Sequence, residues 1–294
     1  MKRELSGYIS GFLGMLGFSL TLPATRIAVS QLDPVFVGLG RAVVAAGLSV
    51  MVLLFTKQSL PSRKFLPQFA IVVAGVIIGF PLLTAWAMRD VPASHGAVVT
   101  GLLPLATALA GVYRGGERPS RQFWLFSTLG SALVVAFTLS SGSRSLHLAD
   151  LTLLGAVIAG GVGYAEGAVL ARTFSAWQVI CWALVFSAPF LLPIILWSGL
   201  PKFSAIGYSA WLGFIYISLV SMFLAFIVWY RGLAIGGIAR VGQVQLLQPF
   251  FTILASGLLL GEQISHDTFI YAMGVALCVA LGRTKLNKGK DRDT

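Results

Sequence analysis

The feature that most constrains this chain is a succession of apolar runs, separated by short breaks that are polar or contain proline or glycine. Each run has about 18 to 25 residues, enough for a helix rising about 1.5 Å per residue to cross the ~30 Å hydrocarbon layer of a bilayer. Hydrocarbon offers no hydrogen-bond partners, so the backbone of such a run must satisfy its own polar groups as a helix. The pattern predicts an all-α integral membrane protein.

The composition favours the same class. Of the 294 residues, 57% are hydrophobic and 11% are charged, whereas roughly 25% are charged in a typical soluble domain. Too few polar side chains remain to cover a water-facing surface, so we expect a lipid bilayer around the chain. The net charge of +11 comes from basic residues dispersed among the breaks, and this dispersal argues against a nucleic-acid partner.

Ten of the runs are predicted to form transmembrane helices. They lie near residues 7–28, 34–56, 67–88, 92–113, 122–141, 151–171, 176–198, 206–230, 237–260 and 266–283. If the N-terminus is cytoplasmic, sixteen Lys and Arg residues fall on the inner side and four on the outer side. An excess of Lys and Arg is typical of the cytoplasmic loops of membrane proteins. We therefore expect a multi-pass protein of the cell membrane, the inner membrane in a bacterium, with both termini in the cytoplasm.

An internal repeat is found when the sequence is shifted on itself by 145 residues. Pro104 then meets Pro249, and the pair Gly116-Glu117 meets Gly261-Glu262. In both copies the glutamate follows the proline by thirteen residues. Chance alignment of two apolar sequences is the alternative explanation.

The repeat predicts two five-helix units, over residues 5–141 and 150–284, followed by a basic cytoplasmic tail over 285–294. Because five is odd, the second unit would cross the membrane in the opposite direction to the first. Inverted repeats of this kind are typical of secondary transporters, where the two units enclose a site near the middle of the bilayer.

Weakly polar residues form a stripe on one face of the predicted helix near 92–113, and again on its repeat partner near 237–260. In lipid such a stripe should turn inward, where it either packs against neighbouring helices or lines a polar cavity. Its recurrence favours a substrate cavity, and deeper aromatic side chains would give this cavity a wall suited to bulky, weakly polar solutes. The predicted cavity residues are Phe18, Trp86, Thr100, Pro104, Thr107, Tyr164, Gln245, Gln248, Pro249 and Thr252.

Two ionisable side chains, Arg41 and Glu166, fall inside predicted helices, where a charge costs about 2.5–3.5 kcal/mol at the membrane centre. Arg41 could pair with Asp33 or with a substrate carboxylate, and Glu166 could carry a proton or bind an ammonium group. Each could instead extend toward the nearer membrane surface. His95 is a further candidate proton site, so protons are a candidate coupling ion alongside a small-molecule substrate.

The sequence carries no enzyme signature. It has no Ser-His-Asp set, no His/Glu cluster with metal-binding spacing and no glycine-rich phosphate loop, which are the arrangements that hydrolytic, metal and nucleotide chemistry require. No catalytic residue, metal or cofactor is therefore expected.

Two patterns point to a known family. Asp33-Pro34 followed by Arg41, and the spacing from proline to Gly-Glu at the end of each unit, resemble the drug/metabolite transporter superfamily and its ten-helix exporters with paired EamA-type domains. The chain departs from that family at Leu16-Gly17-Phe18, where members frequently have a Trp-Gly pair. The resemblance implies export of small metabolites through a central cavity that opens alternately to each side. Within the superfamily, the sequence most resembles bacterial exporters of aromatic and other bulky amino acids.

Together these features predict a secondary transporter that exports amino acids, aromatic or otherwise bulky, or related small metabolites by alternating access. A multidrug exporter of lipophilic compounds would use the same cavity and is the first alternative. A membrane scaffold that transports nothing is the second.

Overall fold

The computed structural model describes residues 2–115, 121–140 and 148–281. All the regular elements in this part of the chain are helices, which confirms the predicted all-α class. Within it, seven helices are long and apolar enough to cross a membrane, and Val244–Leu260 is a shorter apolar helix. The seven are Leu5–Val29, Phe36–Phe55, Arg63–Asp90, Ala93–Arg114, Leu148–Leu170, Ala176–Ser198 and Tyr208–Gly236.

Several of these long helices consist of consecutive elements. In the first half of the chain the elements are α1 (Lys2–Ser19), α2 (Thr21–Val29), η1 (Phe36–Gly40), α3 (Arg41–Phe55), η2 (Arg63–Phe65), α4 (Leu66–Val72), η3 (Val73–Gly79), α5 (Phe80–Asp90), α6 (Ala93–Thr100), α7 (Leu103–Gly115) and α8 (Arg121–Ser140). In the second half they are α9 (Leu148–Leu170), α10 (Ala176–Ser198), η4 (Phe203–Ala205), α11 (Tyr208–Tyr216), η5 (Ile217–Leu224), α12 (Ala225–Gly236), α13 (Ile238–Gly242), η6 (Gln243–Leu247), α14 (Gln248–Leu260) and α15 (His266–Leu281). Elements η1, η3 and η5 are π-helical, and η2, η4 and η6 are 3₁₀-helical.

The predicted helix boundaries agree with the structure to within a few residues at most ends, and the run predicted at 176–198 coincides with α10. The largest difference is at the run predicted at 206–230, which continues to Gly236. Elements α8 and α15 occupy the fifth and tenth predicted ranges but are not among the seven long apolar helices. Element α15 has 16 residues, fewer than the ~20 that a crossing usually needs. Ten crossings therefore stay a prediction.

Two of the predicted helices are interrupted close to a proline. The helix that begins at Ala93 breaks after Thr100, and Pro104 lies in the first turn of α7. In the later helix the 3₁₀ turn η6 leads into α14, whose second residue is Pro249. Proline has no N–H and its ring clashes with the preceding turn, so it is tolerated at the start of a helix and disrupts the turn before it.

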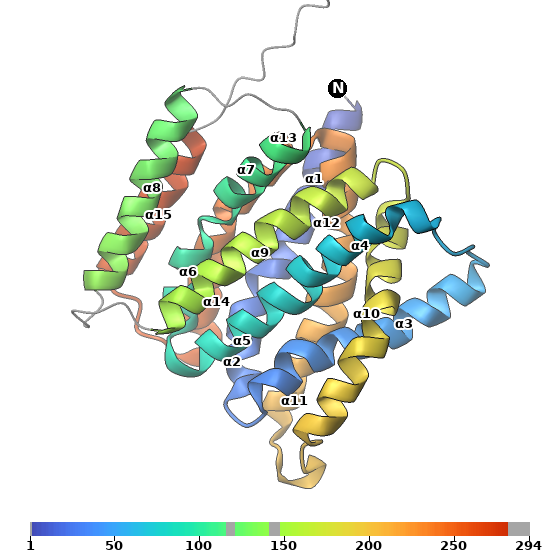
Figure 1. Cartoon of the computed structure of the whole chain (residues 1–294). Coiled ribbons are helices and arrows are strands. Elements are labelled where there is room, and N and C mark those ends of the chain that lie inside the picture. Colours follow the sequence, from blue (N-terminus) through green and yellow to red (C-terminus); the bar gives the residue numbers. More distant parts are fainter. Residues whose placement is uncertain (1, 116–120, 141–147, 282–294) are drawn as a thin grey trace, which may run out of the picture.

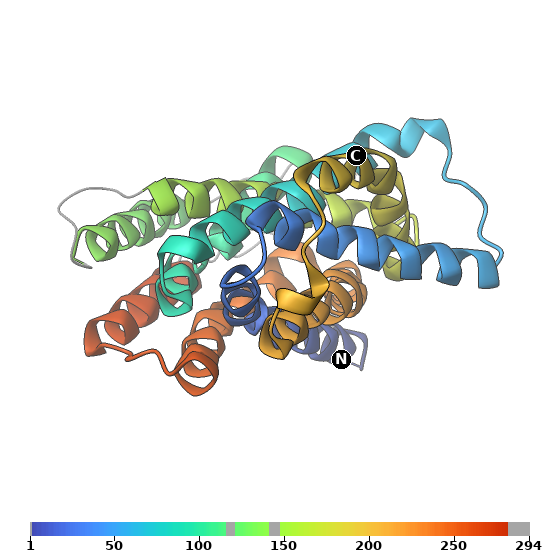
Figure 2. The same cartoon turned by 90° about the horizontal axis from the view of Figure 1, so that it is seen from below.

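The helices form a bundle in which segments far apart in the sequence lie side by side (Figure 1). Element α1 packs along α12, α5 packs along α9, and α3 contacts α10. Elements α8 and α15 pair with each other at one edge of the bundle (Figures 1 and 2). These contacts all join an element of the first half of the chain to an element of the second half.

Glycines bring α1 and α12 into close contact. A Cβ added at Gly7 would lie 2.9 Å from the Cα of Gly236, and one added at Gly232 would lie 2.6 Å from the backbone nitrogen of Gly11. Both distances are too short for real Cβ atoms, so the two backbones approach closely only because these side chains are absent. Small-residue contacts of this kind are typical of helix pairs in membranes.

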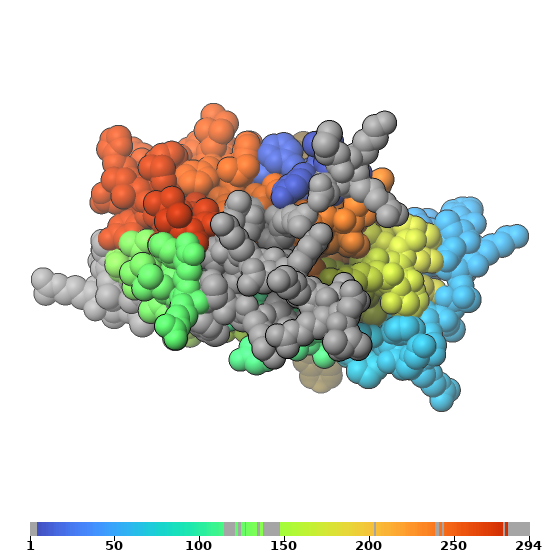
Figure 3. All heavy atoms as spheres, turned by 90° about the horizontal axis from the view of Figure 1, so that it is seen from above, coloured from blue at the N-terminus to red at the C-terminus, as the bar shows by residue number. Residues whose placement is uncertain are grey.

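The bundle has two ends, which we name from Figure 1. Elements α2, α5 and α14 finish, and α6 begins, at the lower end, whereas α7, α9 and α12 finish at the upper end. Figure 3 views the upper end, where the chain that leads into α4 lies beside the C-terminal part of α9.

Candidate functional site

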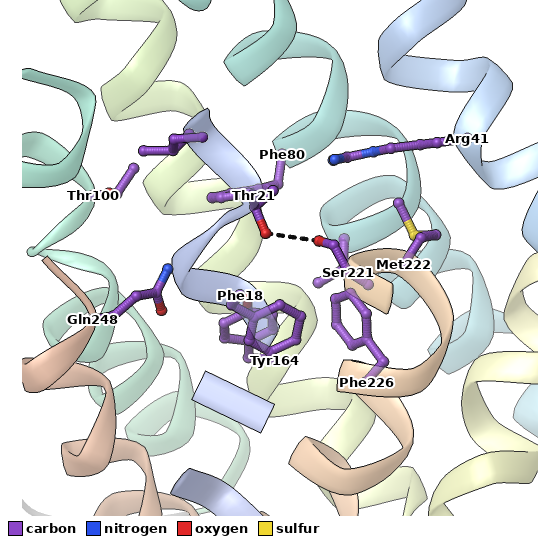
Figure 4. A pocket seen from close by; sticks show the side chains of 12 residues that line it. Phe18, Thr21, Arg41, Phe80, Thr100, Tyr164, Ser221, Met222, Phe226 and Gln248 are labelled. Atoms are coloured by element: carbon purple, nitrogen blue, oxygen red, sulfur yellow. Dashed lines mark hydrogen bonds between the residues drawn. The ribbon is translucent and has the colours of Figure 1, made fainter. Parts of the chain in front are cut away.

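A small cavity lies in the bundle beside two helix breaks, the one between α1 and α2 and the one between α6 and α7. Its volume is about 20 Å³, which is room for about one water molecule. Its walls come from helices of both halves of the chain (Figure 4). The lining residues are Phe18, Thr21, Leu22, Arg41, Val76, Phe80, Thr100, Tyr164, Ser221, Met222, Phe226 and Gln248.

Aromatic rings form one wall of the cavity. Phe18 stacks on Tyr164 with ring centroids 6.0 Å apart, and it meets Phe226 edge-on at 4.9 Å. Trp229 extends this group, with its ring 6.1 Å from that of Phe18. The rings of Phe18, Tyr164 and Phe226 gather on one side of the cavity in Figure 4. Aromatic groups packed in this way offer a large apolar surface to a bound molecule.

Hydroxyl and amide groups form a second part of the lining. The Oγ1 of Thr21 and the Oγ of Ser221 share a hydrogen bond of 2.8 Å (Figure 4). Thr100 donates a hydrogen bond of 2.8 Å to the carbonyl oxygen of Gly96, and Gln248 is buried on the same side of the cavity in Figure 4. These groups supply uncharged dipoles.

Arg41 is the one charged side chain among the described residues that line the cavity. It stands in the first turn of α3, and its guanidinium points into the cavity on the side of Phe80, away from Phe18, Tyr164 and Phe226 (Figure 4). The side chain is 2% exposed, and its Nε and Nη1 have no hydrogen-bond partner in the described part of the chain. The Oδ1 of Asp33, a partner expected from the sequence, accepts instead the backbone N–H of Val35 at 2.8 Å. A buried charge without a counter-ion is costly, so this arrangement needs an explanation beyond folding.

The structure brings together five of the residues selected from the sequence. The five that line the cavity are Phe18, Arg41, Thr100, Tyr164 and Gln248. Five others are buried in the surrounding helices without lining it, namely Pro104, Thr107, Gln245, Pro249 and Thr252. Trp86 was expected deep in the bundle, but its side chain is 40% exposed and does not line this cavity, because α5 buries the face that carries Thr84, Ala85 and Met88.

Thr252 and its repeat counterpart Thr107 differ in what they bond. The Thr252 hydroxyl donates a hydrogen bond of 2.8 Å to the carbonyl oxygen of Ser19, at the break between α1 and α2. In a regular helix that oxygen would accept the backbone N–H of residue 23, but Pro23 has none. The Thr107 hydroxyl donates at 2.8 Å to the Leu103 carbonyl of its own helix.

The other ionisable candidates are engaged with partners. The Glu166 side chain is 1% exposed, and its carboxylate accepts two hydrogen bonds from Arg114, from Nε at 2.6 Å and from Nη2 at 2.8 Å. The Nε2 of His95 and the Oδ1 of Asp150 lie 2.7 Å apart in a second pair. Neither Glu166 nor His95 lines the central cavity.

Seven lining residues were missed in the sequence, namely Thr21, Leu22, Val76, Phe80, Ser221, Met222 and Phe226. The hydroxyls of Thr21 and Ser221 were detectable as polar groups within apolar runs. Their hydrogen bond was not, because the two residues are 200 positions apart. The apolar lining residues cannot be distinguished in the sequence from other apolar residues of the helices. Several of them follow or lie within the π-helical segments η3 and η5. Such segments are frequent at functional sites, but the structure rather than the sequence reveals them.

A wider recess of about 600 Å³ opens at the lower end of the bundle, with Arg26, Met88 and Leu259 on its walls. Arg26 follows Thr21 by five residues in α2, so this recess lies little more than one helical turn from the central cavity.

Glu262 lies beside the recess and connects several elements. Its carboxylate accepts the backbone N–H groups of Ala93 at 2.8 Å and Ser94 at 3.0 Å, and the Ser94 hydroxyl at 2.7 Å. The Nε of Arg26 lies 3.8 Å from the same carboxylate. A carboxylate at a helix N-terminus satisfies free N–H groups and complements the helix dipole, which explains a Gly-Glu pair at this position.

Comparison with known proteins gives the family. The family model of the EamA-like transporters matches residues 5–139 and, separately, residues 147–282. The uncharacterized transporter YdeK of Bacillus subtilis (strain 168) is 48% identical over 283 residues, which cover 96% of this chain and 99% of YdeK. A probable terminal-alkyne amino-acid exporter of Streptantibioticus cattleyicolor is 22% identical over 96% of this chain and 95% of its own length.

A protein of known crystal structure shares the fold, with a TM-score of 0.68 and 18% identity over 94% of this chain and 98% of that one. The family and the most similar of these relatives are transporters rather than enzymes, which agrees with the lack of an enzyme signature in the sequence. The chain therefore belongs to the EamA-like transporter family of the drug/metabolite transporter superfamily.

Proposed function

We propose that this transporter exports amino acids with aromatic or other bulky side chains, or related small metabolites, by alternating access through the central cavity. The observation that carries the proposal is the cavity itself. It has the rings of Phe18, Tyr164 and Phe226 on one side, and the buried guanidinium of Arg41 on the other side, near Phe80. Concave, mostly apolar sites with a few convergent polar groups are typical of small-molecule binding. The cavity is too small for a metabolite in this conformation, so binding must be accompanied by movement of its walls.

The proposal includes ten membrane crossings in two inverted five-helix units, over 5–141 and 150–284. Two separate matches to one family model support a duplicated unit. Shared irregularities support it too, because the shift of 145 residues places η3 on η5 to within one residue. The same shift relates the breaks that precede Pro104 and Pro249.

Helix pairing gives further support to this arrangement. The shift relates α1 to α9 and α12 to α5, and the α1–α12 contact has its counterpart in the α9–α5 contact. Elements α3 and α10 are equivalent helices of the two units and contact each other, as do α8 and α15. Such reciprocal pairing is expected for two units related by an axis in the membrane plane.

Ion pairs between the units occur at both ends of the bundle and suit alternating access. Three pairs of ionisable side chains within the described residues join the first unit to the second, namely Arg26–Glu262, His95–Asp150 and Arg114–Glu166. The first two lie at the lower end and the third lies at the upper end. Separation of the units at one end would break the pairs there and leave the pair at the other end intact.

For orientation, we place the lower end outside the cell and the upper end in the cytoplasm. The excess of basic residues on the inner side supports this orientation, which puts both termini and the basic tail, residues 285–294, in the cytoplasm. The relative YdeK is bacterial, and in a bacterium with two membranes the membrane that holds this transporter would be the inner one.

The charge of the cavity favours amino acids over the lipophilic cations that multidrug exporters handle. A cation would lie close to the guanidinium of Arg41, where like charges repel strongly in a low dielectric. A carboxylate would be attracted. The relative named as a probable amino-acid exporter points in the same direction.

Efflux from proteoliposomes tests the proposal. We expect vesicles that contain the purified transporter to release labelled phenylalanine, tryptophan or leucine faster than protein-free vesicles do, and to release glycine little faster. Ser221→Trp would fill the cavity and should abolish the difference, whereas Ser62→Trp, in an exposed loop, should retain it. Release at the protein-free rate for all twenty amino acids would contradict amino-acid export.

A further inference from the structure

We infer that Arg41 binds the carboxylate of the substrate, and that the cavity prefers monocarboxylate anions with an apolar or aromatic body, for which an amino group is not required. The inference rests on the proposed transport function, and it further specifies the charge that the substrate carries.

The unused hydrogen-bond donors of Arg41 are the first argument. Its Nε and Nη1 are buried, and neither has a partner in the described part of the chain. A guanidinium has five N–H donors arranged as a planar fork, and a carboxylate can accept from two of them at once. A bidentate carboxylate accepts from Nη2 together with either Nε or Nη1, so a ligand carboxylate would satisfy one of the two free donors. It would also pair with a charge that has no acidic partner among the described lining residues.

The charge balance of the cavity is the second argument. No acidic side chain is present among the twelve described lining residues. Glu166 is bonded to Arg114 and does not reach the cavity. A monoanion would therefore form a neutral pair with Arg41, whereas a zwitterion would leave its ammonium group facing hydroxyls and amides only. A buried charge is stable when it is paired and hydrogen-bonded, so the acid without an amine should bind at least as well as the amino acid.

The position of the aromatic wall is the third argument. The rings of Phe18, Tyr164 and Phe226 lie across the cavity from the guanidinium (Figure 4). A carboxylate held at Arg41 would direct the rest of the molecule past Thr21 and Ser221 toward these rings. The arrangement therefore suits a molecule with one anionic end and one apolar end.

A purely structural role for Arg41 makes a different prediction about stability. If the guanidinium serves only to bind a ligand, its burial without an acidic partner among the described lining residues destabilises the unliganded protein. Replacing a buried charged group with an apolar one of similar volume is often neutral or stabilising. We therefore expect Arg41→Met to raise the melting temperature of the unliganded protein by about 2–4 °C while removing ligand binding. A structural role would lower the melting temperature instead.

Binding to the purified full-length transporter in lipid nanodiscs tests the inference with three probes that share one ring. The probes are 3-phenylpropionate, L-phenylalanine and phenethylamine, which are an anion, a zwitterion and a cation at neutral pH. We expect 3-phenylpropionate to bind at least as tightly as phenylalanine, and phenethylamine not to bind. Arg41→Gln should weaken 3-phenylpropionate binding at least about tenfold, and Arg41→Lys should restore part of it. Arg63→Gln, the same substitution at an exposed arginine, should leave binding unchanged.

The outcomes separate this inference from the proposed function. It is overturned if the wild type does not bind 3-phenylpropionate, if phenethylamine binds as tightly, if Arg41→Gln keeps the wild-type affinity, or if Arg41→Met melts at a lower temperature. Arg41-dependent binding of the acid without efflux of any amino acid would uphold the inference and contradict amino-acid export. Efflux of phenylalanine that survives in Arg41→Gln would uphold export and contradict the inference.

Discussion

At the scale of single residues, one hydroxyl completes the interrupted first helix. Pro23 cannot donate a hydrogen bond to the carbonyl oxygen of Ser19, and Thr252 supplies the missing donor at 2.8 Å. Lipid supplies no substitute donor, and an unsatisfied backbone group in hydrocarbon costs several kcal/mol. The break beside the cavity therefore depends on a residue from the second half of the chain.

We expect Thr252→Val to lower the free energy of unfolding by about 1 kcal/mol, because it keeps the shape of the side chain and removes the donor. Denaturant unfolding in detergent micelles measures the change. Thr107→Val is the matched control, since the Thr107 hydroxyl bonds only within its own helix and the backbone can satisfy the same carbonyl. An equal loss in both variants would contradict the role given to Thr252.

Glu166 is bonded on both carboxylate oxygens by Arg114, which suits a contact between the two units better than a proton carrier. We therefore expect Glu166→Gln to change the rate of efflux but to keep the response of efflux to a pH gradient. Proteoliposome efflux with and without the gradient measures this response. If the response is lost in Glu166→Gln and retained in Arg114→Gln, the carboxyl is a proton site after all.

At the scale of elements, most of the helices that surround the cavity are interrupted, whereas α9, which carries Tyr164, is regular. Each of η1, η3 and η5 contributes a cavity residue or directly precedes one, and the break between α6 and α7 follows Thr100. Irregular backbone is tolerated at membrane depth only where protein or a cavity encloses it. The interruptions therefore mark the part of the bundle where the two halves of the chain enclose the site.

The close approach of α1 and α12 predicts a large difference between two glycine substitutions. A Cβ at Gly232 would lie 2.6 Å from the backbone nitrogen of Gly11, whereas a Cβ at Gly47 would meet nothing within 4 Å. We expect Gly232→Ala to destabilise the protein by at least about 1–3 kcal/mol through this overlap. Gly47→Ala should stabilise it by roughly 0.5–1 kcal/mol through helix propensity. Melting temperatures in one detergent measure both changes, and similar values for the two variants would contradict the close packing.

At the scale of the whole molecule, the ion pairs at the two ends bias the equilibrium between conformations. Arg26–Glu262 joins the units at the lower end and Arg114–Glu166 joins them at the upper end. Loss of one pair changes the relative stability of two conformations only if the pair exists in one of them and not in the other. Because Arg26 and Arg114 are partly exposed, solvent screens both pairs, and each contributes about 1 kcal/mol or less.

We expect substitutions at the two ends to open the cavity in opposite directions. Thr21→Cys, in a background in which Cys181 and Cys278 are replaced by alanine, reports access to the cavity through its reaction with membrane-impermeant thiol reagents. Glu262→Gln should speed labelling from the lower end, and Arg114→Gln should speed labelling from the upper end, by roughly two- to fivefold each. Faster labelling from the same end in both variants would contradict alternating access with inverted units.

The sequence by itself determined the all-α class, most helix boundaries to within a few residues and membership of a transporter family. The class and the boundaries depend on local length and hydropathy, since each apolar run must form a helix in lipid whatever its neighbours are. The family was indicated by motifs, above all the recurring spacing from proline to Gly-Glu. For the cavity it supplied Phe18, Arg41, Thr100, Tyr164 and Gln248, which are five of the twelve lining residues. They were found because polar or aromatic groups stand out within apolar helices.

Only the tertiary structure decided which face of each helix points into the bundle and which side chains that are distant in the sequence come into contact. It paired Thr21 with Ser221, bonded Thr252 to Ser19 and turned Trp86 outward. It also left the Nε and Nη1 of Arg41 without a hydrogen-bond partner among the described residues. The physical reason is that the sequence of an apolar helix has similar hydropathy on all faces of the helix, so it does not show which face packs inward. Its rotation and its neighbours are set by packing against helices from the other half of the chain, a contribution that no single segment of the sequence contains.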